Sequence, residues 1–298
     1  MNKDITNEFN YQLSNLERRI TLARGEEMVD LIIKNARIIN VFSGEIQETD
    51  IAMAAGIFVG FGNGYDAKHT YDAQGRYMCP GLIDGHIHIE STFLSPSEFC
   101  NVVAAHGTST VICDPHEIAN VLGPIGLDFF IQSTADLPVK VYFMMPSCVP
   151  STLMETSGST ILSTDIIDYL KRYPDRVIGL GEMMNYPGVV NKNRETLSKI
   201  IAAGSSPKDG HAPLLSGKSL DAYVIAGLGS DHECTTASEA MEKLRLGMHI
   251  MIRQGTHEKN LQDLIVIVNE FNSSHMSLVS DDRSPANLKE NGHIDYLI

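Results

Sequence analysis

The chain has 298 residues, 43% hydrophobic and 20% charged, which is enough to bury one large core plus a small appendage and makes a disordered chain a poor description. Its formal net charge of -14 argues against a nucleic-acid or anionic-membrane partner, because the summed field would repel phosphates. A small neutral substrate or a metal cation is compatible with this charge.

The cysteine content and the first residues indicate the compartment. Five cysteines stand at irregular spacings, and the chain does not start with a charged segment followed by an apolar one. This pattern is typical of reduced thiols in a cytoplasmic protein. No apolar run reaches the roughly 18 residues that span a membrane. We therefore expect a cytoplasmic chain without a membrane partner; its oligomeric state is open, and a homo-oligomer is compatible with the sequence.

The first segment, residues 1–25, has a helical pattern. Phe9, Leu13, Leu16 and Ile20 recur at helical spacing, and Gly25 follows as a natural C-cap. We expect a leader helix over residues 1–25 that packs on a larger body.

A β-rich segment follows over residues 26–80. From Val29 the sequence is rich in β-branched residues and is interrupted by Gly44, Gly56, Gly60 and Gly62. Short antiparallel strands are the expected structure. Because these strands are too few for a stable sandwich, we predict the N-terminal half of a small β-domain that needs a partner.

A strand with two histidines opens the rest of the chain, in the sequence PGLIDGHIHIE from Pro80 to Glu90. His86 and His88 alternate with isoleucines, so on a strand both imidazoles point to the same face. Neutral imidazole is the commonest protein ligand for divalent metals. A chance pair of surface histidines does not explain the interleaved isoleucines, and we predict a metal-binding strand end.

Short apolar strands alternate with longer helical stretches over residues 81–298. We expect helices at 96–106, 164–173 and 238–246, and strands at 82–88, 110–114, 139–145, 177–182, 208–211, 224–232, 248–253 and 276–281. The predicted fold is α/β, a (β/α)8 TIM-like barrel, with a doubly wound sheet as the alternative.

Polar residues stand at the predicted C-terminal ends of several strands, where barrel enzymes carry their active sites. They are His86, His88, Glu182, His211, His232 and the pair Asp281 and Asp282. Four histidines and two carboxylates can hold two metal ions, with Glu182 placed to bridge them. Each has another explanation: Glu182 as a buried ion-pair partner, a histidine in the core, or Asp281 as an N-cap for the segment that opens at Ser284.

The second predicted strand ends in the sequence CDPHE. Asp114, His116 and Glu117 are candidates for a further metal, a substrate contact or proton transfer; equally, Asp114 could cap a helix that begins at Pro115. Glu233 is another candidate proton carrier, or an exposed loop carboxylate.

Histidines outside these motifs are assigned to less specific positions. We expect His69, His275 and His293 at the surface. Arg253 and the CDPHE loop are places where a substrate could be contacted.

The chain resembles the adenine deaminases, a family of the amidohydrolase superfamily, in motifs that come in the same order from Asp30 to Arg283. They read PGLIDGHIHIEST, CDPHEIANVLG, GLGEMMNYPGVV, DGHAPLLSGKSLDAYVIAG, SDHECTTASEAMEKLRLGMHIMIRQG and LVSDDR. Many superfamily members have a carboxylated lysine at the end of strand four, whereas Glu182 stands here, as in adenine deaminases.

The resemblance implies hydrolytic deamination of adenine to hypoxanthine and ammonia in purine salvage, with two divalent ions of manganese, iron or zinc. The positions that match metal ligands are His86, His88, Glu182, His211, His232 and Asp281. A metal lowers the pKa of bound water to about 7, and the resulting hydroxide would attack C6 of the purine. Asp281 would take the proton from that water, and Glu233 or Glu117 would protonate the ring nitrogen and then the departing amine.

Three alternatives accompany this interpretation. The sequence HIE at 88–90 matches half of the cytidine-deaminase signature, but no P-C-x-x-C follows it. A dihydroorotase-like hydrolase of cyclic amides would use much the same metal ligands. Adenine deaminases continue well past strand eight, whereas this sequence is expected to end inside the eighth helix; an inactive truncated fragment that keeps the metal ligands is therefore the third alternative.

Overall fold

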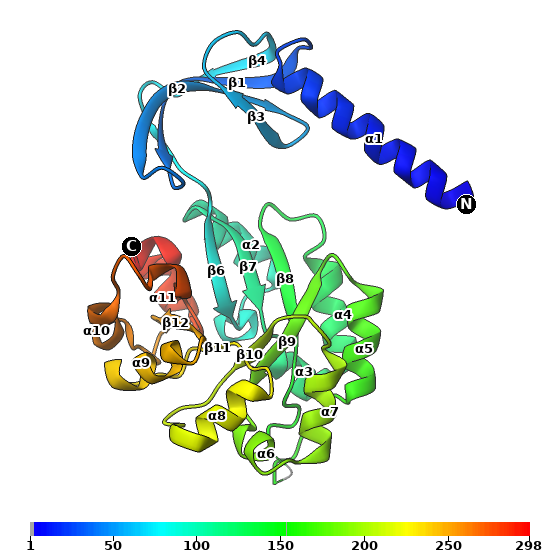
Figure 1. The fold of residues 1–298 in the computed structure, drawn as a ribbon, viewed down its shortest axis with the longest axis vertical. Helices are drawn as coiled ribbons and strands as arrows, with labels where there is room; N and C mark the ends of the chain where they lie inside the picture. Colours follow the sequence, from blue (N-terminus) through cyan, green and yellow to red (C-terminus); the bar gives the residue numbers. More distant parts are fainter. Residues whose placement is uncertain (1–2, 153) are drawn as a thin grey trace. The chain divides into compact units, whose positions relative to one another are not determined.

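The computed structural model describes residues 3–152 and 154–298. The chain divides into two compact units, Met1–Pro80 and Gly81–Ile298, which we describe separately (Figure 1). Among the described residues, no helix is both long enough and apolar enough to cross a membrane. All five cysteines lie in the described ranges and are free thiols.

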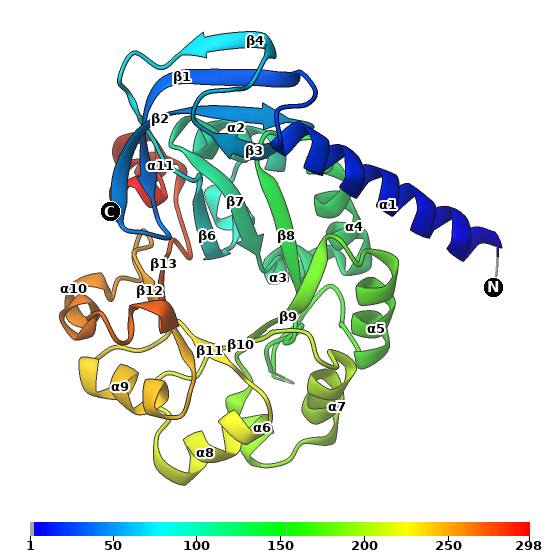
Figure 2. The ribbon, with the colours of Figure 1, turned by 45° about the horizontal axis from the view of Figure 1, so that its top comes forward.

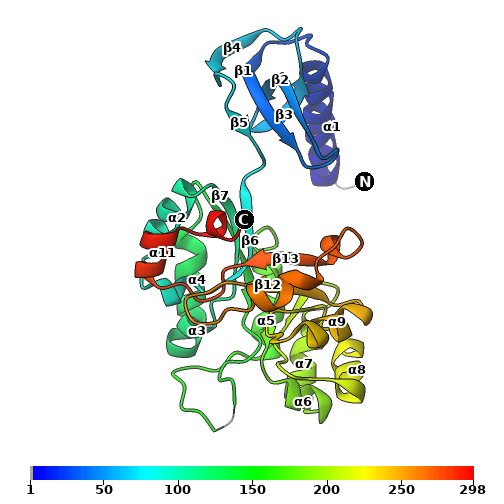
Figure 3. The ribbon, with the colours of Figure 1, turned by 90° about the vertical axis from the view of Figure 1, so that its left-hand side faces the viewer.

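The first unit is built on a five-stranded sheet with the order β3-β2-β1-β4, in which β5 also pairs with β1. The strands β1 (Val29–Asn40), β2 (Glu45–Ala54) and β3 (Ile57–Phe61) are antiparallel neighbours (Figure 3). Val29, Ala52 and related side chains form a small buried cluster on this sheet. The β-branched segment therefore folds into strands as expected.

Two strands of the first unit run in a direction that the sequence did not predict. The strands β4 (Ala67–Asp72) and β5 (Tyr77–Met78) pair with β1 in parallel. A parallel neighbour requires a crossover instead of a tight hairpin. The crossover follows β3 and runs through residues 62–66. It leads the chain to the side of β1 that does not face β2, where β4 pairs. The expected antiparallel strands are confirmed for β1, β2 and β3, and β4 and β5 add two parallel strands beyond that segment.

The expected leader helix is present as α1 (Lys3–Ala23). Gly25 has a φ of 70°, the left-handed conformation of a helix C-cap. Leu22 is buried, and the Tyr65 hydroxyl donates to the Ala23 carbonyl at 2.8 Å, so the last turn is fixed to the sheet of its own unit. The apolar residues Phe9 and Leu16 earlier on α1 are exposed, contrary to the expectation that this stripe packs on a larger body.

The described residues of the second unit, 81–152 and 154–298, form eight parallel strands. One sheet has the order β10-β9-β8-β7-β6 and the other the order β11-β12-β13. The strands are β6 (Leu82–Ile87), β7 (Thr108–Cys113), β8 (Lys140–Met145), β9 (Val177–Met183), β10 (Lys208–Gly210), β11 (Ser230–Asp231), β12 (His249–Arg253) and β13 (Met276–Val279). Because their order follows the chain without reversal, the doubly wound alternative is wrong.

The two sheets of the second unit meet at both ends. The Gly229 amide donates to the Lys208 carbonyl at 3.0 Å, beside β10 and β11, and an isolated parallel bridge joins Ile87 to Asp281 next to β6 and β13. The strands thus form a curled parallel sheet with helices on its outer side (Figure 2). This unit is a mixed α/β fold.

In the part of the second unit that the structure describes, ten α-helices separate or flank these strands. They are α2 (Pro96–Ala105), α3 (His116–Leu122), α4 (Pro124–Ser133), α5 (Ser163–Arg172), α6 (Tyr186–Val190), α7 (Arg194–Ala202), α8 (Gly217–Ile225), α9 (Ala237–Arg245), α10 (Leu261–Leu264) and α11 (Pro285–Asn291). Short 3-10 turns lie at Ile89–Thr92, Ile265–Ile267, Ser273–His275 and Ile294–Tyr296.

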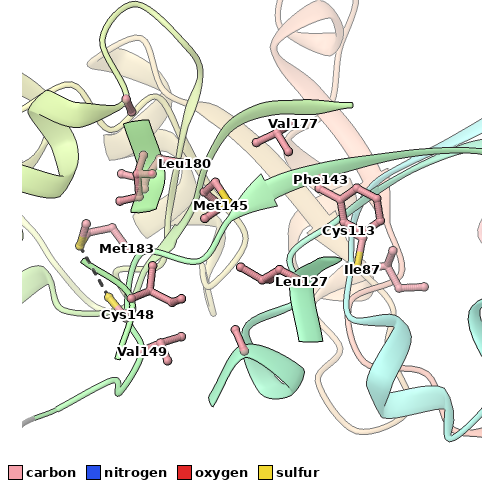
Figure 4. Packing of buried hydrophobic residues seen from close by; sticks show 14 of the residues in the cluster. Ile87, Cys113, Leu127, Phe143, Met145, Cys148, Val149, Val177, Leu180 and Met183 are labelled. Carbon is pink, nitrogen blue, oxygen red and sulfur yellow. Dashed lines mark hydrogen bonds between the residues drawn. The ribbon is translucent and has the colours of Figure 1, made fainter. Parts of the chain in front are cut away.

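The core of the second unit lies between the strands and the outer helices. Ile87, Cys113, Phe143 and Leu180 come from four neighbouring strands, and Leu127 of α4 packs with them (Figure 4). Six of the seven residues of β9 are buried, as expected for a parallel strand with both faces covered. This packing holds the ends of the strands in fixed positions.

Two predictions about elements of the second unit are wrong. Residues 224–232 were expected as one strand, but Val224 lies in the last turn of α8, and only Ser230–Asp231 forms a strand. Gly227, with a φ of 103°, lies between the helix and the strand. The last helix was expected to continue to the end of the sequence. Instead α11 ends at Asn291, and Gly292 follows it with a φ of 88°.

Candidate metal centre

Glu182 is the residue on which the predicted ligands converge. It lies near the end of β9, and its side chain is 4% exposed. Its Oε2 is 2.9 Å from His232 Nε2, 3.1 Å from His211 Nδ1 and 3.6 Å from His86 Nε2. A buried carboxylate surrounded by imidazoles in this way is a typical ligand set for a divalent metal.

The ring of His86, on β6, is oriented by a carboxylate on β10, at the other edge of the same sheet. Its Nδ1 lies 3.1 Å from Oδ2 of Asp209 on β10, and the Ser230 hydroxyl donates to the other oxygen of Asp209 at 2.5 Å. An imidazole that donates Nδ1–H to a carboxylate has Nε2 free as a lone-pair donor. His86 Nε2 is buried and has no hydrogen-bond partner.

His88 is oriented in the same sense by a backbone carbonyl. Its Nδ1 donates to the Asp114 carbonyl at 2.8 Å, and its Nε2 lies 3.4 Å from Oδ1 of Asp281. Asp281 follows β13 and has a φ of 55°, a left-handed conformation that is uncommon outside glycine and is concentrated at functional sites. Its Oδ1 is also 3.8 Å from His86 Nε2.

Two ligand groups of this cluster share one residue. His86, His88 and Glu182 form one group, and Glu182, His211 and His232 form the other; in each, the possible ligand atoms lie within 4.8 Å of one another. Glu182 is thus placed between two possible metal positions. The buried atoms His86 Nε2 and His232 Nδ1 have no hydrogen-bond partner in the structure. Unpaired buried donors are uncommon, so the residues fit a group that binds them.

The electrostatics of the cluster favour bound positive charge. Burial by itself would raise the pKa of Glu182, but hydrogen bonds from His116, His211 and His232 hold it well below its usual value. Burial also opposes protonation of His86, but Asp209 and Glu182 raise its pKa to about 9. Metal ions bind in exchange for such protons.

Of the CDPHE residues, His116 joins the cluster directly. Its Nε2 lies 3.0 Å from Glu182 Oε1. Asp114 is buried, and its Oδ2 accepts from the Glu182 amide at 2.7 Å, while its Oδ1 has no partner. It does not cap α3, whose N-cap is Pro115, so that alternative is wrong. Glu117 is at the rim: its side chain is 40% exposed and 3.8 Å from His88 Nδ1.

Glu233 is close to the ligands and is held by an arginine. Its Oε1 lies 3.6 Å from both His211 Nδ1 and His232 Nε2. Arg253 at the end of β12 binds both oxygens of Glu233 and also Oδ2 of Asp281. The Ser284 hydroxyl is the N-cap of α11, so the alternative that Asp281 caps this segment is wrong.

A protein-family comparison agrees with this arrangement. Residues 77–294 match the model of the amidohydrolase family. The chain belongs to the amidohydrolase family. The match spans all the predicted ligands and the curled parallel sheet that carries them.

Curated relatives of this amidohydrolase carry one name. The adenine deaminases of Oleidesulfovibrio alaskensis, Desulfatibacillum aliphaticivorans and Thermosipho melanesiensis are 54%, 50% and 49% identical to it, each over 94% of the chain and 49% of the relative. The chain therefore spans about half the length of the curated relatives it matches.

Solved structures are similar in fold at low sequence identity. A crystal structure of an amidohydrolase has a TM-score of 0.56 at 10% identity and covers 86% of this chain and 79% of its own. The N-acyl-D-glutamate deacylase of Bordetella bronchiseptica, solved with zinc and a phosphonate inhibitor, has a TM-score of 0.53 at 15% identity. The match covers 76% of this chain and 58% of the deacylase chain.

Sequence reasoning missed two residues next to the ligands of this amidohydrolase. Asp209 orients His86; the signal that could have found it is its position two residues before His211, the same spacing that marked His86 and His88. His293 was expected at the surface, but it is fully buried. Its Nδ1 is 2.8 Å from the Thr108 hydroxyl, and its Nε2 is 3.0 Å from Asp84 Oδ2.

The buried pair of Asp84 and His293 is connected to the predicted ligand Asp281 through Ser280, the residue before it. Both the amide and the hydroxyl of Ser280 donate to the Asp84 carboxylate, the amide at 3.0 Å. No local pattern marks His293, because its partner Asp84 lies more than two hundred positions earlier in the chain.

Proposed function

We propose that this chain carries the catalytic unit of an adenine deaminase, which hydrolyses adenine to hypoxanthine and ammonia. The observation that carries this proposal is the placement of Glu182 in two ligand groups at once, in a chain whose relatives are named adenine deaminases. Because those relatives are about twice as long, the activity, the substrate and the place in purine salvage are proposals for this chain.

We propose further that the eight strands of the second unit form a (β/α)8 barrel. The bridge between Ile87 and Asp281 and the pairing across Gly229 support this, because they connect the two parallel sheets at both ends. On this view the ligands lie at the C-terminal mouth of the barrel, and the first unit is part of a small β-domain.

The proposed cofactor is a pair of divalent ions of manganese, iron or zinc. His86, His88 and Asp281 would hold one ion, His211 and His232 the other, and Glu182 would bridge them. Such ions supply an activated water, since coordination lowers its pKa to about 7. Imidazole and carboxylate ligands suit all three metals.

The residues of this chain would move two protons during the reaction. Water adds to C6 of adenine, one of its protons passes to a ring nitrogen and the other to the departing amine, and the C6–N bond breaks. Asp281 is placed to accept the first proton, because its Oδ1 faces the histidines while Arg253 holds its Oδ2. Glu233, 3.6 Å from two of the histidines, is the proposed carrier to the purine, and the more exposed Glu117 is the alternative.

A cavity beside the ligands offers room for the purine. It has a volume of about 320 Å³ and is lined by His116, Glu117, Asn120, Cys148 and Met184, among others. Sulfur-containing and polar side chains together suit a flat heteroaromatic ring with several nitrogen atoms. We place adenine in this cavity, next to His116 and therefore next to Glu182.

The proposed cellular setting is the cytoplasm, with a small-molecule partner only. Support comes from the five free thiols, which suit a reducing compartment, and from the acidic charge of the chain, which disfavours nucleic acid.

The test is a comparison of substrates with the metal-reconstituted chain. We expect conversion of adenine to hypoxanthine, followed by ultraviolet absorbance, with manganese, iron(II) or zinc, and no hydrolysis of dihydroorotate. Hydrolysis of the cyclic amide without turnover of adenine would overturn the assignment of substrate. A chain that binds two metals and turns over neither compound would support the inactive-fragment alternative.

A further inference from the structure

A buried ion network lies behind one of the two ligand groups. It consists of Lys243 and Glu239 of α9 and Asp231 at the end of β11, and we call it the Lys243 network. Lys243 and Asp231 are fully buried, and Glu239 is 9% exposed. Charged side chains are rarely buried without a partner, because their desolvation is costly.

The ammonium group of Lys243 makes two hydrogen bonds and one further ion pair. Its Nζ donates to the Ala212 carbonyl at 2.7 Å and to Glu239 Oε1 at 2.8 Å, and it lies 3.2 Å from Asp231 Oδ1. A lysine side chain has N–H donors and no acceptor, so all three partners are of the type that it can bind. One helix side chain therefore fixes two carboxylates and one loop carbonyl.

The two carboxylates in turn hold the backbone that carries the ligands. Asp231 accepts from the Ala212 amide at 2.9 Å and from the Glu233 amide at 2.8 Å. Ala212 directly follows His211, and Glu233 directly follows His232. The backbone of Ala212 is thus held on both sides, because its amide donates to Asp231 and its carbonyl accepts from Lys243.

Glu239 binds the backbone of both loops a few residues beyond the contacts of Asp231. Its Oε1 accepts from the Leu214 amide at 2.7 Å, and its Oε2 accepts from the Thr235 amide at 3.0 Å. The loops at 211–214 and 232–235 are therefore bound to one another through α9. Hydrogen bonds of this kind fix the positions of ligand side chains, as partners behind a metal ligand generally do.

We propose that the Lys243 network is a positioning device that sets the separation of His211 and His232 for the ion they share with Glu182. This inference rests on the proposed metal centre. The rings of His211 and His232 are 5.2 Å apart, and each has a nitrogen within 3.1 Å of Glu182 Oε2. The other group, which contains His86 and His88, has its own partners in Asp209 and the Asp114 carbonyl. The network acts on one of the two ions.

The test measures metal affinity and the visible spectrum of cobalt(II) bound to the apo chain. In the variant Lys243→Met we expect one of the two ions to bind 10–100-fold more weakly, with a changed cobalt spectrum, and the other to keep its affinity. Glu239→Gln, which keeps the Lys243–Asp231 pair and is the milder change, is expected to act in the same direction and serves if Lys243→Met does not fold.

The control is Ile131→Ala, a buried position on α4 outside the network, which lowers thermal stability and leaves both affinities and the spectrum unchanged. A folded Lys243→Met or Glu239→Gln chain with the cobalt spectrum and both affinities of the wild type would overturn the positioning role. Equal weakening of both ions would reduce the network to general stability. A wild-type chain that binds no metal would instead overturn the proposed metal centre.

Discussion

Single residues set the direction of each imidazole at the candidate centre. His86 and His88 both direct Nδ1 to an oxygen acceptor, Oδ2 of Asp209 and the Asp114 carbonyl. In both rings Nε2 then carries the free lone pair and faces Asp281 or Glu182. An oriented ring of this kind does not lose rotational freedom when it binds a metal.

The variant Asp209→Asn tests this orientation at the residue scale. We expect the ion held by His86 to bind about 10–100-fold more weakly, because the amide lacks the charge that fixes the Nδ1–H tautomer. Isothermal titration of the apo chain with manganese measures it. Asp175→Asn, at an exposed position of the same unit, is the control and should bind like the wild type. Unchanged affinity in Asp209→Asn would show that the carboxylate does not orient His86.

Among the elements, the contact between β9 and Asp114, the residue that follows β7, depends on a glycine. A Cβ at Gly181 would lie 2.2 Å from Asp114 Oδ2, the oxygen that accepts from the Glu182 amide. The absence of a side chain in β9 thus lets the buried Asp114 reach the strand that carries Glu182. The same residue holds His88 through its carbonyl.

Gly181→Ala should therefore lower both stability and metal affinity. We expect a loss of about 1–3 kcal/mol in the free energy of unfolding, the usual cost of overpacking, measured by urea denaturation of the apo chain. At Gly229 a Cβ has its nearest neighbour at 4.0 Å, so Gly229→Ala is the matched control and should be tolerated. If Gly181→Ala has the same free energy of unfolding as Gly229→Ala, the Asp114 side chain can move away without cost. That result would contradict the inference that Asp114 holds β9 in place.

Most strands of the second unit, and its helices α2, α5 and α9, could be predicted from the sequence, and the reason is local. β8 and β9 are short apolar runs. Ser95, Asn193 and Thr236 are the N-caps of α2, α7 and α9, and each accepts a hydrogen bond from a backbone amide of its helix. The strand predicted at 224–232 was too long, because a short apolar segment such as that around Val224 is compatible with either a helix or a strand. The parallel pairing of β4 with β1 was missed because pairing partners are not encoded locally.

The candidate site was predictable where its residues follow strands, and only there. His86, His211 and Asp281 could be found from their places at strand ends. The supporting residue His293 lies outside the strands, and its partner Asp84 comes from a distant part of the chain. Lys243 lies on α9 and reaches Asp231 of β11 only because the helix packs there. Their roles follow from tertiary packing and have no signature in the sequence.

At the scale of the whole molecule, every predicted ligand belongs to the unit Gly81–Ile298. The ligands come from both sheets of that unit: Glu182 lies on β9, His232 follows β11, and Asp281 follows β13. A metal that binds them all stabilises the folded unit by mass action, because the unfolded chain does not hold these residues together. Metal binding and folding are therefore coupled in this account.

The proposed role of Glu182 as the bridge between two ions determines how much metal the chain holds, so metal stoichiometry is the measurement to make. The apo chain and its Glu182→Gln variant are reconstituted with excess manganese, dialysed, and analysed for metal by mass spectrometry. We expect two ions per wild-type chain and no more than one in the variant, since glutamine lacks the negative charge and the second oxygen ligand. Two ions in Glu182→Gln, or fewer than two in the wild type, would contradict the bridging role.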